Sequence, residues 1–176
     1  SNLKMELELK GKSALIRGGS VGIGYAVAEA LAKEGVNLCL IARNKERLDA
    51  SADTIAKTYG VKAIPYNADV SKADDLLNLK DSLEKEFGGL DILINNAGTG
   101  SEETIMEADD EKWQYYWDLH VMAAVRISRM LVPLMKKNNG GVIINNASIC
   151  ASQPLYYEPI YNVTKAALSM FSKCLA

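Results

Sequence analysis

One stretch near the start of the chain decides which fold to expect: Ala14-Leu15-Ile16-Arg17-Gly18-Gly19-Ser20-Val21-Gly22-Ile23-Gly24. It begins with a short apolar run typical of a buried strand, and a segment of helical periodicity follows it. Glycines at such a junction let the backbone turn sharply and approach a pyrophosphate, while the helix amino terminus supplies unpaired N–H groups. The spacing Gly-x-x-x-Gly-x-Gly is weak evidence alone, but its place in the first strand–helix unit favours a dinucleotide site. We expect this site to use Gly18, Ser20, Gly22, Ile23 and Gly24.

The same alternation continues along the chain. Short apolar runs, which predict strands, lie at residues 14–16, 38–42, 63–66, 92–94 and 142–144. Segments of helical spacing lie between them, at residues 23–33, 45–58, 72–87 and 113–137. Ser71 and Asp74 predict a capping box for the third helix, and the glycine pairs at 88–89 and 140–141 are typical helix ends. The pattern predicts an α/β fold: a three-layer, doubly wound parallel sheet (a Rossmann fold) forming one domain over residues 1–176.

Composition excludes several classes of protein. The 176 residues are 48% hydrophobic and 24% charged with a net charge of -2, which gives no electrostatic case for binding nucleic acid or an anionic membrane. No apolar run has the length of a membrane span, and the polar start is not a signal peptide, so we expect a cytoplasmic protein. The three scattered cysteines favour a reducing compartment. His120 is the only histidine, which argues against a metal site and against a Ser-His-Asp triad.

The end of the second predicted strand indicates the cofactor. NAD-selective sites usually place a carboxylate about twenty residues beyond the glycines to bind the ribose hydroxyls. This chain has Ile41-Ala42-Arg43-Asn44 there, without an acid. Arg43 would pair with the 2′-phosphate of NADP, so we expect NADPH to be preferred, with NAD as the alternative. The competing interpretation is that Arg43 only caps or solvates the following helix.

A candidate catalytic pair lies near the end of the chain. Tyr161 and Lys165 are four residues apart, which places them on one face of a helix. A tyrosine ordinarily has a pKa of about 10, and a neighbouring ammonium favours its phenolate and so suits it to proton transfer. Ser148 follows the fifth predicted strand, at the sheet edge where open α/β sheets bind ligands. Each feature alone also has a bland explanation, a chance pair on a helix or a loop serine bonding its own backbone. Their order along the chain favours a site.

At this point the chain resembles the classical short-chain dehydrogenase/reductase family over essentially its whole length. The resemblance rests on the glycine loop, on Asp69 and Val70 as the pair that contacts adenine, and on Asn95-Asn96-Ala97-Gly98 beside the cofactor. It implies that Ser148, Tyr161 and Lys165 are catalytic, with Tyr161 as general acid or base and Lys165 also holding the nicotinamide ribose. It further implies a small-molecule carbonyl or alcohol substrate, a reductase similar to the 3-oxoacyl-carrier-protein reductase branch, and a homodimer or homotetramer.

Three departures from the family pattern leave questions open. Arg17 stands where the family usually has a threonine that braces the loop, and it reaches either a phosphate or a carboxylate. His120 stands where the family has a helix asparagine that fixes a water. It either holds a water and relays protons as a catalytic group, or only satisfies a local backbone carbonyl. Family members also continue past the helix in which this chain stops, so we expect the chain to lack the C-terminal part of the family.

Two other functions stay open from the sequence. One is a non-catalytic NAD(P)-binding sensor, which would keep the fold without turnover. The other is an NAD-dependent alcohol dehydrogenase of the same family. The aromatic residues from Trp113 to Trp117 are expected to serve packing or a subunit interface rather than the substrate.

Overall fold

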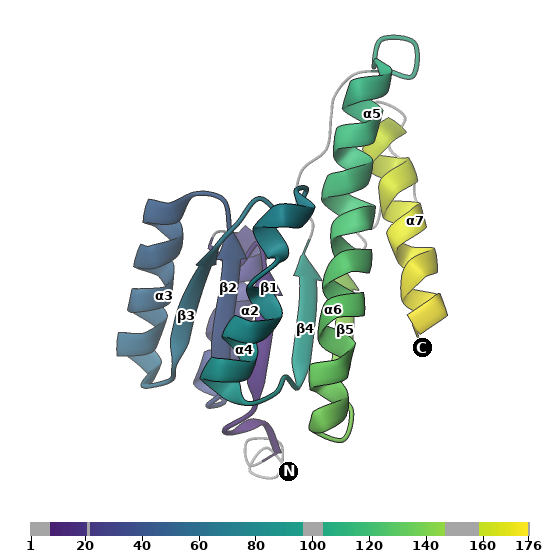
Figure 1. The fold of residues 1–176 in the computed structure, drawn as a ribbon. Helices are drawn as coiled ribbons and strands as arrows, with labels where there is room; N and C mark the ends of the chain where they lie inside the picture. Colours follow the sequence, from purple (N-terminus) through teal and green to yellow (C-terminus); the bar gives the residue numbers. More distant parts are fainter. Residues whose placement is uncertain (1–7, 21, 97–103, 147–158, 176) are drawn as a thin grey trace.

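The computed structural model describes residues 8–20, 22–96, 104–146 and 159–175, and its centre is a parallel sheet (Figure 1). Five strands form this sheet in the order β3-β2-β1-β4-β5, and every neighbouring pair is parallel. The strands are β1 (Ser13–Arg17), β2 (Asn37–Ala42), β3 (Ala63–Asn67), β4 (Ile92–Asn96) and β5 (Val142–Asn146). The order reverses between β1 and β4, and open α/β sheets bind ligands at the carboxyl ends of the strands at such a point. The predicted doubly wound fold is confirmed.

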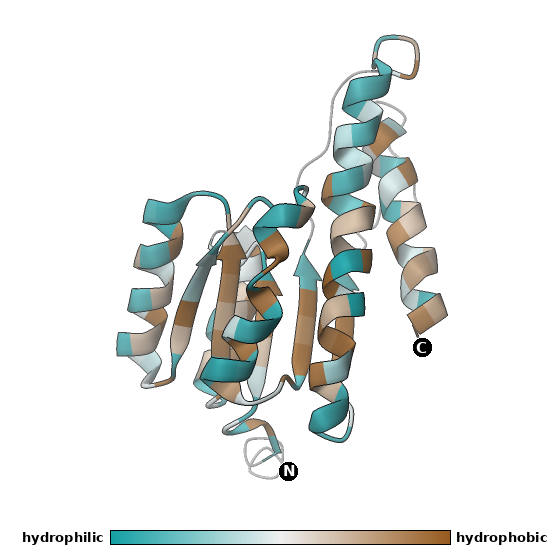
Figure 2. Ribbon diagram, viewed as in Figure 1, coloured by the Kyte–Doolittle hydropathy of each residue, from teal (hydrophilic) through white to brown (hydrophobic). Residues whose placement is uncertain are grey.

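Helices cover both faces of the sheet. One face packs against α2 (Gly22–Lys33) and α3 (Lys45–Tyr59), and the other against α4 (Leu79–Phe87) and α6 (Ala123–Lys137). Along β1 the buried side chains alternate between the two cores, with Ala14 and Ile16 in the first and Leu15 in the second. Strands buried on both faces are expected to be apolar throughout. Figure 2 shows mostly hydrophobic strands, whereas the side of α4 turned to the viewer is mostly hydrophilic.

The predicted helix at 72–87 is two elements, and its capping box is wrong. A 3₁₀ turn, η1 (Ala73–Leu76), precedes α4, which begins only at Leu79. The Ser71 hydroxyl does not cap a helix, because it donates to Asp69 Oδ1 at 2.6 Å. The Asp69 N–H in turn donates to Asp75 Oδ2 at 2.8 Å. Short polar side chains therefore bond within this turn instead of starting a helix.

The predicted helix at 113–137 contains a change of helical type. It runs as α5 (Asp110–Trp117), a π turn η2 (Asp118–Met122) and α6, with Asp109 as the N-cap of α5. Single π turns inside α-helices frequently occur at functional sites. The last helix, α7 (Pro159–Leu175), lies beside this long helical run in Figure 1 and contacts both η2 and α5. None of the helices in the described ranges has both the length and the apolar character needed to cross a membrane.

Candidate active site

The glycine loop folds tightly between β1 and α2. Gly18 has a φ of +72°, a conformation that costs other residues about 1–2 kcal/mol, and its N–H donates to the Ile41 carbonyl at 2.8 Å. A Cβ on Gly24 would lie 2.7 Å from the carbonyl carbon of Gly18, closer still to its oxygen, and 3.0 Å from Asn96 Nδ2. The amino-terminal turn of α2 therefore meets the end of β1 with no room for a side chain. Such a cradle of backbone against a helix amino terminus fits a pyrophosphate.

Two other predicted loop residues differ in their surroundings. Ser20 is nearly buried, and its carbonyl accepts a hydrogen bond from Ser51 Oγ on α3 at 3.0 Å. Ile23 is 67% exposed on the first turn of α2. Ser20 thus anchors the loop to α3, while the Ile23 side chain is exposed to solvent. Asn96, at the carboxyl end of β4, is close to both Gly18 and Gly24. Its contact with the cofactor stays a prediction.

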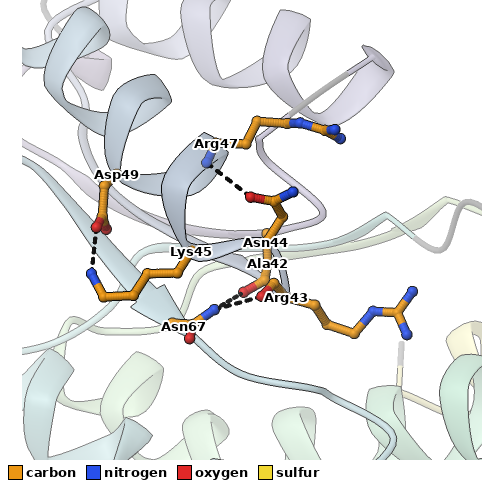
Figure 3. Close-up of polar contacts among 7 residues, drawn as sticks. All are labelled: Ala42, Arg43, Asn44, Lys45, Arg47, Asp49 and Asn67. Atoms are coloured by element: carbon orange, nitrogen blue, oxygen red, sulfur yellow. Dashed lines mark hydrogen bonds and ion pairs between the residues drawn. The ribbon is translucent and has the colours of Figure 1, made fainter.

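The backbone around Arg43 is fixed from two sides (Figure 3). Asn67, at the end of β3, donates through Nδ2 to the carbonyls of Ala42 and Arg43 at 3.0 and 2.8 Å. Asn44 Oδ1 accepts the Arg47 N–H at 3.0 Å and is the N-cap of α3. The alternative that Arg43 caps this helix is therefore wrong. Its exposed guanidinium instead extends away from α3 and donates to the Tyr115 hydroxyl on α5 at 3.1 Å.

The expected adenine pair follows β3. Val70 is buried, whereas Asp69 is partly exposed. Burial alone would raise the pKa of Asp69, but the Ser71 hydroxyl and N–H, followed by the charges of Arg43 and Lys72, outweigh it and lower that pKa. This edge of the sheet thus combines the Asp69 carboxylate, whose ionised form is favoured, with the Arg43 cation.

Arg17 is a buried cation at the end of β1, directly before the glycine loop. Its side chain is almost fully enclosed, and Nη2 donates to the carbonyl of Leu119 in the π turn. Burial lowers the pKa of Arg17 from 12.5 to about 10, although the charge of Asp69 partly offsets this effect. The sequence left a phosphate or a carboxylate as its partner, but the hydrogen bond is to a backbone carbonyl. Arg17 therefore ties the end of β1 to the turn that carries His120.

His120 contacts α7 through a residue that sequence reasoning missed. His120 is fully buried in η2, and its Nδ1 lies 2.8 Å from Thr164 Oγ1 on α7. The same hydroxyl donates to the Ile160 carbonyl at 2.9 Å. Lys165, next to Thr164, is also fully buried. The Nδ1 partner of His120 is thus a hydroxyl 44 residues away rather than a local backbone carbonyl. The position of Thr164 directly before Lys165, the predicted catalytic lysine, was the available signal.

A chain of polar side chains, also missed from the sequence, attaches α7 to the sheet. Asn95 Nδ2 donates to Asn145 Oδ1, and Asn145 Nδ2 donates to Ser172 Oγ, both at 2.7 Å. Ser172 Oγ donates in turn to the Leu168 carbonyl at 3.0 Å. Because Asn95 is fully buried, the hydrogen bond to Asn145 satisfies an amide nitrogen that would otherwise be costly to bury. It fixes the helix that carries Tyr161 and Lys165 against β4 and β5.

Some expected site residues lie outside the described part. Ala97, Gly98 and Ser148 do so entirely, and of Tyr161 only the backbone, in the first turn of α7, is described. The helix places Tyr161 one turn before Lys165, on the same face. The described residues therefore include the glycine cradle, Arg43, His120 and Lys165.

Comparison with known proteins identifies the family. A family model described as short chain dehydrogenase matches residues 12–176. The chain belongs to the short chain dehydrogenase family. A short chain dehydrogenase of the fungus Pseudocercospora fijiensis is 36% identical over 172 residues, covering 96% of this chain and 55% of that protein. The resemblance inferred from the glycine loop, Ser148, Tyr161 and Lys165 is confirmed at the level of the family, while the reductase branch suggested by analogy stays a prediction.

Solved structures of short chain dehydrogenase relatives show the same fold. L-sorbose reductase from Gluconobacter frateurii, complexed with NADPH and L-sorbose, is 57% identical with a TM-score of 0.92 over 94% of this chain and 63% of that one. NADPH-dependent 3-quinuclidinone reductase from Rhodotorula rubra is 32% identical with a TM-score of 0.89 over 96% of this chain and 64% of that one. The chain thus spans 55% to 64% of the length of these three proteins.

Proposed function

We propose that this protein reduces the carbonyl group of a ketose similar to L-sorbose, with NADPH as the hydride donor. The observation that carries the cofactor part is the exposed guanidinium of Arg43 at the end of β2, next to a glycine cradle that a single Cβ at Gly24 would fill. The substrate class rests on the 57% identity with L-sorbose reductase, which was solved with NADPH and L-sorbose.

Selection of NADPH depends on how Arg43 is held. The two hydrogen bonds from Asn67 fix the 42–43 and 43–44 peptides on either side of the Arg43 Cα, and the cap at Asn44 fixes the first turn of α3. The guanidinium is then presented to solvent at a defined place, where it would pair with the dianionic 2′-phosphate of the adenosine ribose. A ribose without this phosphate would offer no anion to the guanidinium, and residues 41–44 offer no carboxylate for the 2′-hydroxyl.

The remaining roles concern proton transfer. The bound dinucleotide would supply a hydride to the carbonyl carbon. Tyr161 would donate its phenolic proton to the carbonyl oxygen, so that the C=O bond becomes CH–OH and Tyr161 is left as a phenolate. Lys165, one helical turn away, would stabilise this phenolate and hold the nicotinamide ribose, while Ser148 would orient the carbonyl. His120 would return a proton from solvent to Tyr161.

Residues 1–176 act in this proposal as one dinucleotide-binding domain. A homodimer or homotetramer, with a small carbonyl or alcohol compound as the only other partner, stays a prediction. The adenine contacts of Asp69 and Val70, and the cofactor contacts of Ala97 and Gly98, are part of the same proposal. A sensor without turnover and an NAD-dependent dehydrogenase are the alternatives, which turnover assays and cofactor titration would reveal.

The cofactor part is tested by titrating the protein with NADPH and NADH and measuring nicotinamide fluorescence. We expect Arg43→Ser to weaken NADPH about 10- to 100-fold, because a charge-assisted bond contributes about 1.5–3 kcal/mol, and to leave NADH unchanged. Lys45→Ser is the matched control, since it also removes a cation. The Lys45 amine points away from Arg43 and lies 2.5 Å from Asp49 Oδ2 (Figure 3). Equal losses for both cofactors in Arg43→Ser, or an NADH preference in the parent, would contradict the proposal.

A further inference from the structure

The contact between η2 and α7 fixes more than the position of a side chain. We infer that Thr164 is a positioning residue that holds His120 in the tautomer protonated on Nδ1, so that the lone pair of the neutral ring lies on Nε2. The inference deepens the proposed function, because it specifies how the ring assigned to proton return is prepared. It concerns a pair of residues, His120 and Thr164, that belong to different elements 44 residues apart.

The tautomer can be assigned by counting hydrogens. The Ile160 carbonyl can only accept a hydrogen bond, and Thr164 Oγ1 lies 2.9 Å from it. A hydroxyl has one hydrogen, and in this geometry it is directed to that carbonyl. The second contact of Oγ1, at 2.8 Å from His120 Nδ1, must then be one in which the oxygen accepts. The hydrogen of this bond is therefore carried by Nδ1.

Burial enforces this assignment. His120, Thr164 and Ile160 are fully buried, so water cannot replace a hydrogen bond that is given up. Complete burial also favours the neutral ring over the charged one. With the hydrogen on Nε2 instead, Nδ1 would face a lone pair of Oγ1, unless the hydroxyl turned toward the ring and lost its bond to Ile160. Either rearrangement forfeits one buried hydrogen bond that the Nδ1–H tautomer keeps.

The backbone that carries His120 is held from the opposite side. The guanidinium of Arg17, at the end of β1, donates to the carbonyl of Leu119, the residue before His120. The π turn is thus attached to the sheet through Arg17 and to α7 through Thr164. Because both attachments are buried, they restrain the imidazole ring of His120 in one orientation. In that orientation Nε2 carries the lone pair, while Nδ1–H stays with Thr164.

Nuclear magnetic resonance of the ¹⁵N-histidine-labelled protein reads the tautomer directly. His120 is the only histidine of this chain, and a His120→Asn variant identifies its signals. We expect the parent to show a protonated Nδ1 and an unprotonated Nε2, Thr164→Ser to keep this pattern, and Thr164→Val to shift the population toward Nε2–H. A parent with its hydrogen on Nε2, or a Thr164→Val variant with the parent pattern, would overturn the inference. The parent spectrum decides even if Thr164→Val does not fold.

Turnover separates this inference from the proposed function. A wrong tautomer at an acid–base histidine costs up to about 10⁴ in kcat, and for a relay we expect a fall of about 10-fold in Thr164→Val with unchanged NADPH affinity. Thr164→Ser should restore kcat, since it keeps the hydroxyl. Nδ1–H in a parent without turnover would refute the proposed function alone. Turnover with Nε2–H in the parent would refute only the role of Thr164.

Discussion

The glycine cradle gives the sharpest prediction, through the variant Gly24→Ala. The added methyl would lie 2.7 Å from the carbonyl carbon of Gly18, and closer to its oxygen. Carbon atoms in contact prefer about 3.5–4.0 Å, so the turn of α2 and the end of β1 must separate by about 1 Å. A displacement of this size in a site that positions a substrate can lower the reaction rate about 10²-fold.

The expected results are therefore a large loss of binding and a moderate loss of stability. We expect Gly24→Ala to weaken NADPH at least about 10-fold, that is by about 1.4 kcal/mol or more. Overpacking of this kind costs about 1–3 kcal/mol of folding stability, and each kcal/mol lowers the Tm by about 2–4 °C in a chain of this size. Fluorescence titration measures the first effect and thermal unfolding the second.

The matched control is Gly60→Ala at the end of α3. Gly60 has a φ of +68° and nothing near the position of a Cβ, so the variant suffers only backbone strain of about 1–2 kcal/mol. It should melt earlier, as Gly24→Ala does, and still bind NADPH as the parent does. A Gly24→Ala protein that binds NADPH with parental affinity would refute the reasoning, because the cradle would then tolerate a side chain.

Three further predictions concern the surroundings of the site. Because its hydrogen bonds and neighbouring cations lower the pKa of Asp69, its contribution to stability is present above the ordinary carboxyl pKa and is lost as pH falls through the lowered value. Asp69→Asn should thus reduce the urea midpoint at neutral pH and converge with the parent in acid, and a pH-independent difference would contradict this. Asn145→Ala leaves the buried amide of Asn95 without its acceptor, so we expect a loss of about 1–3 kcal/mol in the free energy of unfolding, whereas an unchanged Tm would be against it. Burial, with a smaller effect from a nearby carboxylate, raises the pKa of Cys39 to about 12, so iodoacetamide at mildly alkaline pH should label the exposed Cys174 and leave Cys39 intact, as peptide mass mapping would show.

Much of the fold could be predicted because its three central strands, β1, β2 and β4, are buried on both faces. Such strands appear as short apolar runs, and those around Leu15, Leu40 and Leu93 mark β1, β2 and β4. The 3₁₀ turn before α4 and the π turn in the long helix could not be predicted. Helical periodicity continues through both, while the hydrogen bonds that define them depend on local turns and on packing against distant elements.

The features of the candidate site likewise fall into those that local sequence predicts and those that it does not. The glycine loop and the position of Arg43 could be predicted from local spacing, because backbone turns and strand ends are local properties. The partners of Arg17 and His120 depend on side chains that approach across 102 and 44 residues of sequence. No local pattern marks Leu119 or Thr164 as those partners, because the contacts exist only once β1, η2 and α7 are packed together.

The most direct test of the account measures NADPH oxidation after L-sorbose is added to the parent and to Tyr161→Phe. We expect turnover in the parent and a loss of about 10²-fold or more in Tyr161→Phe, with NADPH binding retained, because only the proton donor is removed. Tyr59→Phe is the control, since it also removes a hydroxyl, one that bonds Glu29 on α2. NADPH binding without turnover in the parent would indicate a sensor, and undiminished turnover in Tyr161→Phe would contradict the central claim.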